Sequence, residues 1–305
     1  MQSRKSAFFV ALVAVVLLAM TSLASAGVYT AVIAYGDSLS DNGNLFAADG
    51  NTYPPPPYWH GRMSNGQVTV EYLANSLHSP LYDFAWIGAT TGVGNYADGG
   101  TQTSFGVHGF PGMLPQVAGT LPSLGAIAPS SLFVVWGGPN DFVSNGFSMA
   151  TADAAVADLV SIVGSLQGAG ARHILVPGMP DLGLTPDYLG NAGATALSLY
   201  FNHELVTLLP HGAVYFDTFA FMHEVTTDPG AFGFTNVNTP CFDGTTICSD
   251  PGQYLFWDGF HPTTAADQIL AAQFANAIPE PSSLLMLGTG VVGLAGMLKR
   301  KMSAQ

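Results

Sequence analysis

Short apolar runs recur along the chain and are separated by segments rich in Gly, Pro and Asp. Many residues in these runs are β-branched or aromatic. Continuous apolar runs of about four to eight residues are typical of strands buried on both faces of a parallel sheet. The pattern therefore predicts strands at residues 29–35, 82–87, 131–136, 173–178 and 213–219.

Longer segments with helical composition lie between these predicted strands. They cover residues 68–77, 151–167, 194–209 and 264–277. Strands that alternate with helices predict βαβ units and a parallel sheet with helices on both faces. We therefore expect an α/β fold in which ligands bind at the carboxyl ends of the strands.

Two long loops, at residues 42–66 and 88–112, interrupt this alternation. Loops of this length in a compact domain are usually either functional or disordered. The first contains consecutive prolines at 54–57, with aromatic residues on both sides, and the second is rich in Gly and Thr. The proline and aromatic content of the first loop favours an ordered wall of a cleft.

The first 26 residues have the pattern of a secretory signal peptide. Arg4 and Lys5 precede an apolar run at 7–20, and Ala24-Ser25-Ala26 forms an A-x-A cleavage site. A membrane helix is the alternative, but the run is shorter than the about 20 residues that a span needs. We expect an exported protein whose mature chain starts at Gly27.

Residues 279–305 contain three parts in a defined order. A Pro-Glu-Pro motif at 279–281 is followed by an apolar segment at 282–298 and a basic cluster at 299–301. This tail resembles the PEP-CTERM sorting signal of Gram-negative bacteria. The resemblance implies a transient transmembrane anchor in the inner membrane, an exosortase-type processing enzyme as partner, and a final place at the cell surface or outside the cell, beside extracellular polysaccharide. A permanent tail anchor is the alternative.

Between the two terminal signals, residues 27–278 fit a single domain. The sequence has seven Lys and Arg against twenty Asp and Glu, and Arg62 and Arg172 are the only Lys or Arg residues in this body. Binding to nucleic acid or to anionic lipid by charge needs a basic surface, so the composition argues against both. In an exported protein, Cys241 and Cys248 predict one short-loop disulfide, with metal ligation as the alternative.

The first predicted strand ends at Gly36-Asp37-Ser38. These residue types are common in turns, so a plain turn is one explanation. The other is that the turn presents Ser38 as a nucleophile at a strand end. Serine is a poor nucleophile unless a base removes its proton and donors stabilise the developing oxyanion. The choice therefore depends on whether the chain offers such partners.

Candidate partners occur at the ends of other predicted elements. Asp258 lies three residues before His261, close enough in a turn for the carboxylate to reach the imidazole. Gly88 follows the second predicted strand and offers a backbone N–H group. Asn140 follows the third and offers a side-chain amide. Each feature alone is weak, but together they form the set that a serine hydrolase needs.

The sequence also resembles the GDSL, or SGNH, hydrolases. GDSLSDNGN at 36–44 is similar to the first signature block of that family, and GRMSNG at 61–66 to an element of its lipase-like branch. The resemblance implies a nucleophile at Ser38, a triad completed by Asp258 and His261, and an oxyanion hole formed by Ser38, Gly88 and Asn140.

The second block departs from the family pattern. Asp83 stands where the family often has Asn, and Ile87 where it often has the first Gly. Gly88 itself is retained.

The resemblance further implies a three-layer α/β/α fold with a five-stranded parallel sheet. It implies hydrolysis of small carboxylic esters or lipids through an acyl-enzyme, with no metal or organic cofactor. An alcohol acceptor in place of water would make the protein an acyltransferase. Two alternatives are a carbohydrate acetyl esterase acting on extracellular polysaccharide and a catalytically silent matrix protein.

Overall fold

The computed structural model describes residues 29–278. The predicted signal peptide, sorting tail and transmembrane segment lie outside the described residues. The five strands form one parallel sheet in the order β2-β1-β3-β4-β5, which confirms the expected fold class. The strands are β1 (Val32–Gly36), β2 (Leu81–Asp83), β3 (Leu132–Trp136), β4 (His173–Pro177) and β5 (Ala213–Phe216).

All four predicted helices are present; the ends of three are shifted by one or two residues, and the fourth has the predicted bounds. They are α3 (Thr69–Ser76), α6 (Met149–Gly168), α7 (Ala192–Leu208) and α9 (Thr264–Ala277). Further helices were not predicted, namely α2 (Asn44–Ala48), α4 (Met113–Leu124), α5 (Pro139–Asn145) and α8 (Thr218–Thr227). Short 3₁₀ turns fill several of the connections between them.

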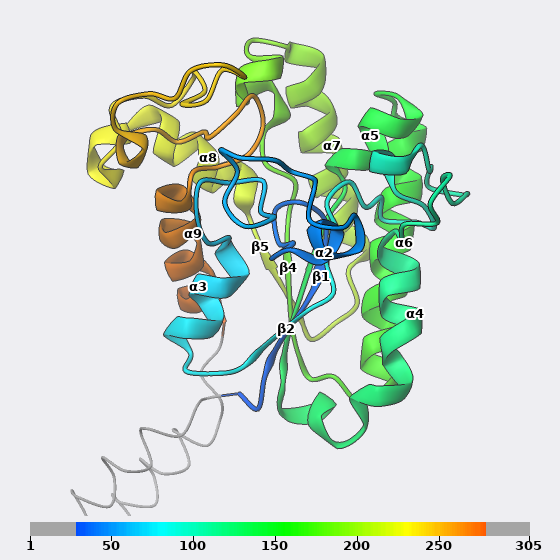
Figure 1. The fold of residues 1–305 in the computed structure, drawn as a ribbon. Coiled ribbons are helices and arrows are strands. Elements are labelled where there is room, and N and C mark those ends of the chain that lie inside the picture. The colour runs from blue at the N-terminus through cyan, green and yellow to red at the C-terminus, as the bar shows by residue number, and fades with distance from the viewer. Residues whose placement is uncertain (1–28, 279–305) are drawn as a thin grey trace, which may run out of the picture.

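The central strands carry apolar side chains on both faces, so the sheet separates two cores. Ile33 and Phe133 pack on the side of α4, α6 and α7, whereas Val32 and Leu132 pack on the side of α3 and α9. Figure 1 shows these helices on opposite sides of the sheet. This arrangement is the three-layer sandwich that the alternation of strands and helices predicted.

The two edge strands differ from the prediction. β2 has only three residues, β5 ends at Phe216 rather than at 219, and neither edge strand is fully buried. Asp217 ends β5 because its side chain accepts a hydrogen bond from the N–H of Ala220 and so caps α8. An edge strand has a neighbour on one side only, so it needs less apolar surface than a central strand.

By length and composition, α6 is the one helix within residues 29–278 that is apolar enough to cross a membrane. Ala155, Leu159 and Ile162 on this helix are buried in the core against the sheet. A core helix passes the same composition test, and the packing of α6 is that of a core helix.

The strand ends position the candidate site. β1 and β3 pair from Val32 with Leu132 to Gly36 with Trp136, so both strands end at the same level. Strand order reverses at β1, because β2 lies on one side of it and β3 on the other. In open parallel sheets, ligands bind at such a reversal, outside the carboxyl ends of the strands.

A buried carboxylate joins α3 to α9 close to this edge. Asp267 of α9 is 1% exposed. Its two oxygens accept hydrogen bonds from the Thr69 hydroxyl (2.7 Å) and the Ser64 hydroxyl (3.3 Å). Burial raises the pKa of Asp267 to about 8, although the two hydroxyl donors and the charge of His261 act in the opposite direction. The folded protein therefore holds this proton well above the pH at which an unfolded chain releases it.

The raised pKa of Asp267 predicts that the protein loses stability as pH rises. An unfolded aspartate releases its proton near pH 3.9, so between about pH 4 and pH 8 the folded state binds more protons at this site. The free energy of unfolding then falls by up to about 1.4 kcal/mol per pH unit for this group. We expect Asp267→Asn to flatten the fall in melting temperature from pH 5 to pH 8, as measured by thermal unfolding. The control, Asp49→Asn at an exposed position, should leave the wild-type slope; equal slopes in all three proteins would contradict the prediction.

Candidate active site

The GDS segment forms a tight turn directly after β1. The N–H groups of Ser40 and Asp41 both donate to the carbonyl oxygen of Asp37, at 3.1 and 2.9 Å. The Asp37 carboxylate also accepts from the N–H of Leu39 at 3.0 Å. The turn reverses the chain at the end of β1 and places Ser38, 7% exposed, at the carboxyl edge of the sheet.

The structure brings Ser38, His261 and Asp258 together from opposite ends of the chain. Nε2 of His261 lies 2.8 Å from Oγ of Ser38. Nδ1 of the same ring lies 2.9 Å from Oδ2 and 3.0 Å from Oδ1 of Asp258. The side chains of His261 and Asp258 are each 13% exposed. The three groups therefore form a continuous hydrogen-bonded line that is mostly buried.

The charges in this line shift both pKa values. Burial by itself would raise the pKa of Asp258, but the His261 charge and hydrogen bonds to the carboxylate lower it to about 2. Burial by itself would lower the pKa of His261, but the Asp258 carboxylate and, more weakly, Asp37 and Asp267 raise it above its ordinary value. Each member of the pair thus favours the charged form of the other.

Asp41 holds the nucleophile turn against the loop that carries Gly88. Its buried carboxylate accepts hydrogen bonds from the N–H groups of residues 43–45 on its own segment. It also accepts from the N–H of Ile87 at 2.7 Å. Asn95 holds the same residue from the other side, because its amide donates to the carbonyl oxygen of Ile87 at 2.9 Å. Ile87 is fixed on both sides, and so is the peptide that follows it.

Gly88 has a backbone conformation that favours glycine. Its φ is 80°, and a Cβ atom would lie 2.5 Å from Oδ1 of Asn95. Within residues 29–278, the backbone N–H groups of Gly88 and Ser38 donate no hydrogen bond to another group of the chain. Both donors are available to a bound ligand.

Asn140 lies in the first turn of the short helix α5, beside the same loop. Its side-chain amide donates to the carbonyl oxygen of Ala89 at 3.1 Å. The next residue, Asp141, accepts from both the N–H and the hydroxyl of Thr91, each at 2.9 Å. Burial raises the pKa of Asp141 to about 7, with the Thr91 bonds acting against this shift. These contacts place the amide of Asn140 next to Gly88.

Asp83, which stands where the GDSL pattern often has Asn, has a structural role of its own. The Asp83 carboxylate accepts from the N–H of Asn42 (2.8 Å) and of Ala85 (2.9 Å), and the Asn44 amide donates to the carbonyl oxygens of Asp83 and Ala85. Burial, followed by the charge of Asp41, raises the pKa of Asp83 well above its ordinary value. Asp83 thereby ties the polar segment after Ser38 to the end of β2.

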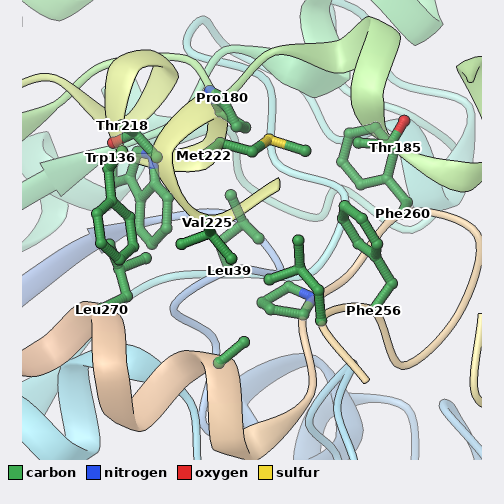
Figure 2. A pocket seen from close by; sticks show the side chains of 14 residues that line it. Leu39, Trp136, Pro180, Thr185, Thr218, Met222, Val225, Phe256, Phe260 and Leu270 are labelled. Carbon is green, nitrogen blue, oxygen red and sulfur yellow. The ribbon is translucent and has the colours of Figure 1, made fainter. Parts of the chain in front are cut away.

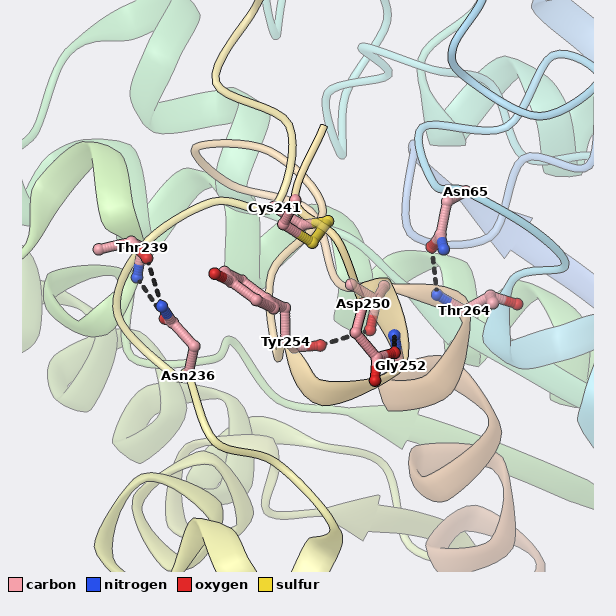
Figure 3. Close-up of a disulfide and its surroundings, with 10 residues drawn as sticks. Asn65, Asn236, Thr239, Cys241, Asp250, Gly252, Tyr254 and Thr264 are labelled. Carbon is pink, nitrogen blue, oxygen red and sulfur yellow. Dashed lines mark hydrogen bonds between the residues drawn. A yellow bond between two sulfur atoms is a disulfide. The ribbon is translucent and has the colours of Figure 1, made fainter. Parts of the chain in front are cut away.

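The GRMSNG element supports the segment that follows His261. The Arg62 guanidinium forms an ion pair with Glu71 at 2.6 Å. The Ser64 hydroxyl donates to the carbonyl oxygen of Pro262, and the Asn65 side chain accepts from the N–H of Thr264 at 2.9 Å. Figure 3 shows this last contact at the start of α9. The element therefore fixes the start of α9, the helix that begins three residues after His261.

Cys241 and Cys248 are disulfide-bonded, as predicted from the sequence. The loop that they close pairs with the chain just before Asp258, because the N–H groups of Cys241 and Phe242 donate to the carbonyl oxygens of Phe256 and Trp257. Figure 3 shows the bridge at Cys241. The disulfide thus restrains the strand-like stretch that ends at the candidate triad.

The structure gathers all the site residues expected from the sequence at one edge of the sheet. Sequence reasoning missed Asp41, Asn95 and Asp141, which hold the expected residues in place. Within residues 29–278, no group of three or more His, Cys, Asp or Glu side chains is arranged to hold a metal ion.

Three relatives are 27 to 30% identical to the chain over the aligned residues. A thermolabile hemolysin of Vibrio parahaemolyticus is 27% identical over 81% of this chain and 63% of its own length. An uncharacterized protein of Pseudomonas putida is 30% identical over 85% of this chain and 50% of its own length. A phosphatidylcholine-sterol acyltransferase of Aeromonas hydrophila is 28% identical over 79% of this chain and 73% of its own length. The chain thus spans about half to two thirds of the first two of these relatives.

One sorting motif and one protein family match defined ranges of the chain. Residues 277–301 match the PEP-CTERM protein-sorting motif, which implies an exported protein that an exosortase processes and that is sorted to the cell surface. Residues 32–274, nearly the whole described domain, match the GDSL-like lipase/acylhydrolase family, whose members include esterases, lipases and acyltransferases. The chain belongs to the GDSL-like lipase/acylhydrolase family.

Proposed function

We propose that this protein is an exported serine esterase that hydrolyses carboxylic esters of short apolar acids through an acyl-enzyme on Ser38. The observation that carries the proposal is the line from Ser38 through His261 to Asp258, with contacts of 2.8 and 2.9 Å. A serine within hydrogen-bond reach of an imidazole that is itself oriented by a carboxylate is the arrangement that activates a hydroxyl nucleophile.

Each group has one role in the proposed reaction. His261 takes the proton of Ser38 through Nε2, while its Nδ1–H group donates to Asp258. Oγ of Ser38 attacks the ester carbonyl carbon, and the oxyanion is held by the N–H groups of Ser38 and Gly88 and by the amide of Asn140. His261 then gives its proton to the leaving alcohol. Water attacks the acyl-enzyme by the same path, and the acid is released with Ser38 restored.

An apolar cavity that is lined by the chain neighbours of Ser38 and His261, and by neither of these two residues, supports an apolar acyl group over an acetylated sugar. The cavity has a volume of about 80 Å³. Leu39 follows Ser38 in the chain, Phe260 and Pro262 flank His261, and all three line the cavity. Figure 2 shows Leu39 and Phe260 among the lining side chains. Met222 and Val225 of α8 also line the cavity. A sugar would leave its hydroxyl groups unpaired in such surroundings, whereas a hydrocarbon chain gains free energy by leaving water.

The triad assignment predicts large losses of turnover with an intact fold. Ser38→Ala, His261→Ala and Asp258→Asn should each lower kcat on p-nitrophenyl butyrate by about 10⁴-fold or more. Asn140→Ala should cost about 10²- to 10³-fold, as for one oxyanion donor. A fluorophosphonate probe should label the wild type but not Ser38→Ala, and the exposed Ser123→Ala variant serves as the control. Equal labelling of Ser38→Ala would refute the assignment.

If the acyl group of the substrate occupies this cavity, the lining side chains limit its length, which predicts a preference for short acyl chains. A volume of about 80 Å³ is smaller than the about 150 Å³ apolar cavity that holds benzene, so we expect acyl groups of about four to six carbons to be cleaved fastest. Val225→Phe should fill the cavity and shift the optimum toward acetate. Met222→Ala should enlarge it and shift the optimum toward longer chains. The measurement is kcat/KM across p-nitrophenyl esters of graded length.

The matched control for this series is Val206→Phe, which makes the same exchange at an exposed position of α7. Acetylated xylo-oligosaccharides, assayed beside the p-nitrophenyl esters, test the carbohydrate esterase alternative. Higher kcat/KM on these sugars than on every acyl ester, with no response to Val225→Phe or Met222→Ala, would refute the acyl-ester assignment.

We also propose that the tail is a transient anchor. An apolar helix of the length of 282–298 is about 25 Å long, which barely matches a hydrocarbon core of about 30 Å. Gly288, Gly290, Gly293 and Gly296 weaken it further as a helix. Cleavage near Pro281 would release the catalytic domain to the cell surface.

Cleavage of the tail predicts a shortened mature protein. Mass spectrometry of protein recovered from the native host's surface or medium should find a C-terminus near residue 281. Full-length protein through Gln305 held in the inner membrane would instead establish the permanent anchor.

A further inference from the structure

Tyr58 of the proline-rich loop contacts the carboxylate of Asp258. Its hydroxyl donates to Oδ2 of Asp258 at 2.8 Å, across 200 residues of sequence. The same oxygen lies 2.9 Å from Nδ1 of His261. One carboxylate oxygen therefore receives both the tyrosine hydroxyl and the imidazole N–H group.

Among the described residues, 29–278, Tyr58 is the one donor that reaches the Asp258 carboxylate from outside its own turn. The other carboxylate oxygen accepts from the backbone N–H groups of Phe260 and His261, at 2.8 and 2.7 Å. Within residues 29–278, every hydrogen bond to this carboxylate except that of Tyr58 comes from residues 260 and 261. The local bonds set the turn, and Tyr58 ties the turn to a separate part of the molecule.

The tyrosine ring is itself held in place. It packs edge-on against Trp257 and Phe242, with ring centroids 6.4 and 5.9 Å apart, and those two rings stack on each other at 5.7 Å. Phe242 lies next to Cys241 of the disulfide. On the other side, four prolines at 54–57 precede Tyr58 and limit the freedom of its loop. A hydroxyl on so restrained a ring has a defined position.

We propose that Tyr58 is a positioning residue, whose hydroxyl holds Oδ2 of Asp258 toward His261 and so keeps Nε2 of His261 directed at Ser38. The role rests on the proposed function, because it concerns the alignment of the same three groups. Tyr58 and Asp258 also line an open cavity of about 350 Å³, so water can replace the hydroxyl when it is removed. Water hydrates the oxygen but does not fix its direction, and the loss should be smaller than that of a triad member.

The experiment is Tyr58→Phe in the full chain, which removes the hydroxyl and keeps the ring packing. We expect kcat on p-nitrophenyl butyrate to fall on the order of 10-fold, below the about 10²-fold that a 1 Å misplacement can cost. KM and the melting temperature should stay at the wild-type values. The proton NMR resonance of His261 Nδ1–H, assigned by its absence from His261→Ala, should move, because its carboxylate acceptor has changed.

The matched control is Tyr200→Phe. The hydroxyl of Tyr200 donates to Oδ1 of Asp153 at 2.7 Å on the exposed surface of α6 and α7, so the exchange removes an equivalent hydrogen bond far from Asp258. It should change neither kcat nor the His261 resonance.

Two results would overturn the proposal. One is a Tyr58→Phe enzyme with wild-type kcat and an unmoved His261 resonance. The other is a loss of activity that is matched by an equal rise in KM, which would place Tyr58 in substrate binding. A wild type without esterase activity would refute the proposed function alone, and the His261 resonance would still decide the contribution of Tyr58.

Discussion

The buried carboxylate of Asp41 joins the two segments on which the site depends. It takes N–H groups from residues 43–45 on one side and from Ile87 on the other. Burying a carboxylate costs free energy unless such donors compensate the lost hydration. These bonds therefore hold the two segments together. Asp41 lies three residues after Ser38, and Ile87 directly precedes Gly88. One side chain therefore sets the distance between the nucleophile and the neighbouring free N–H group.

The central strands were predictable because their burial leaves a continuous apolar signal in the sequence. β1 and β3 are buried along their whole length, and their predicted carboxyl ends lie within one residue of the observed ones, although β1 begins three residues later than predicted. The predicted end of β5 was wrong. Apolar residues continue past Phe216, but the side chain of Asp217 caps a helix that starts there. α4 was not predicted because it contains Pro115, Gly119 and Pro122, residues that normally argue against a helix. There, packing against the sheet outweighs the local preference.

The site residues divide in the same way. Ser38, Asn140 and His261 lie at element ends beside turn residues, so each left a local signal that could be combined with the others. The sequence gives no sign of the bonding role of Asp41, because an aspartate in a polar turn looks the same whether it is exposed or accepts hydrogen bonds from four backbone N–H groups. Tyr58 left no local signal either, since its partner is 200 residues away and only the folded chain brings the two together. Local pattern finds the reacting groups, whereas the groups that hold them depend on tertiary contacts.

The carboxylates near His261 differ in a way that bears on the mechanism. Burial raises the pKa of Asp267 to about 8 and that of Asp37 to about 6, and the hydrogen bonds to each carboxylate oppose this only in part. The pKa of Asp258 instead falls to about 2 despite its burial, because the imidazole and two backbone N–H groups favour its charge. Environments that push neighbouring pKa values apart assign different roles to chemically identical groups. Near neutral pH, His261 therefore has Asp258 as its fully ionised partner, while Asp267 is mostly protonated. The positive charge that His261 acquires when it takes the Ser38 proton is thus stabilised mainly along the Nδ1 direction, which keeps Nε2 directed at the serine.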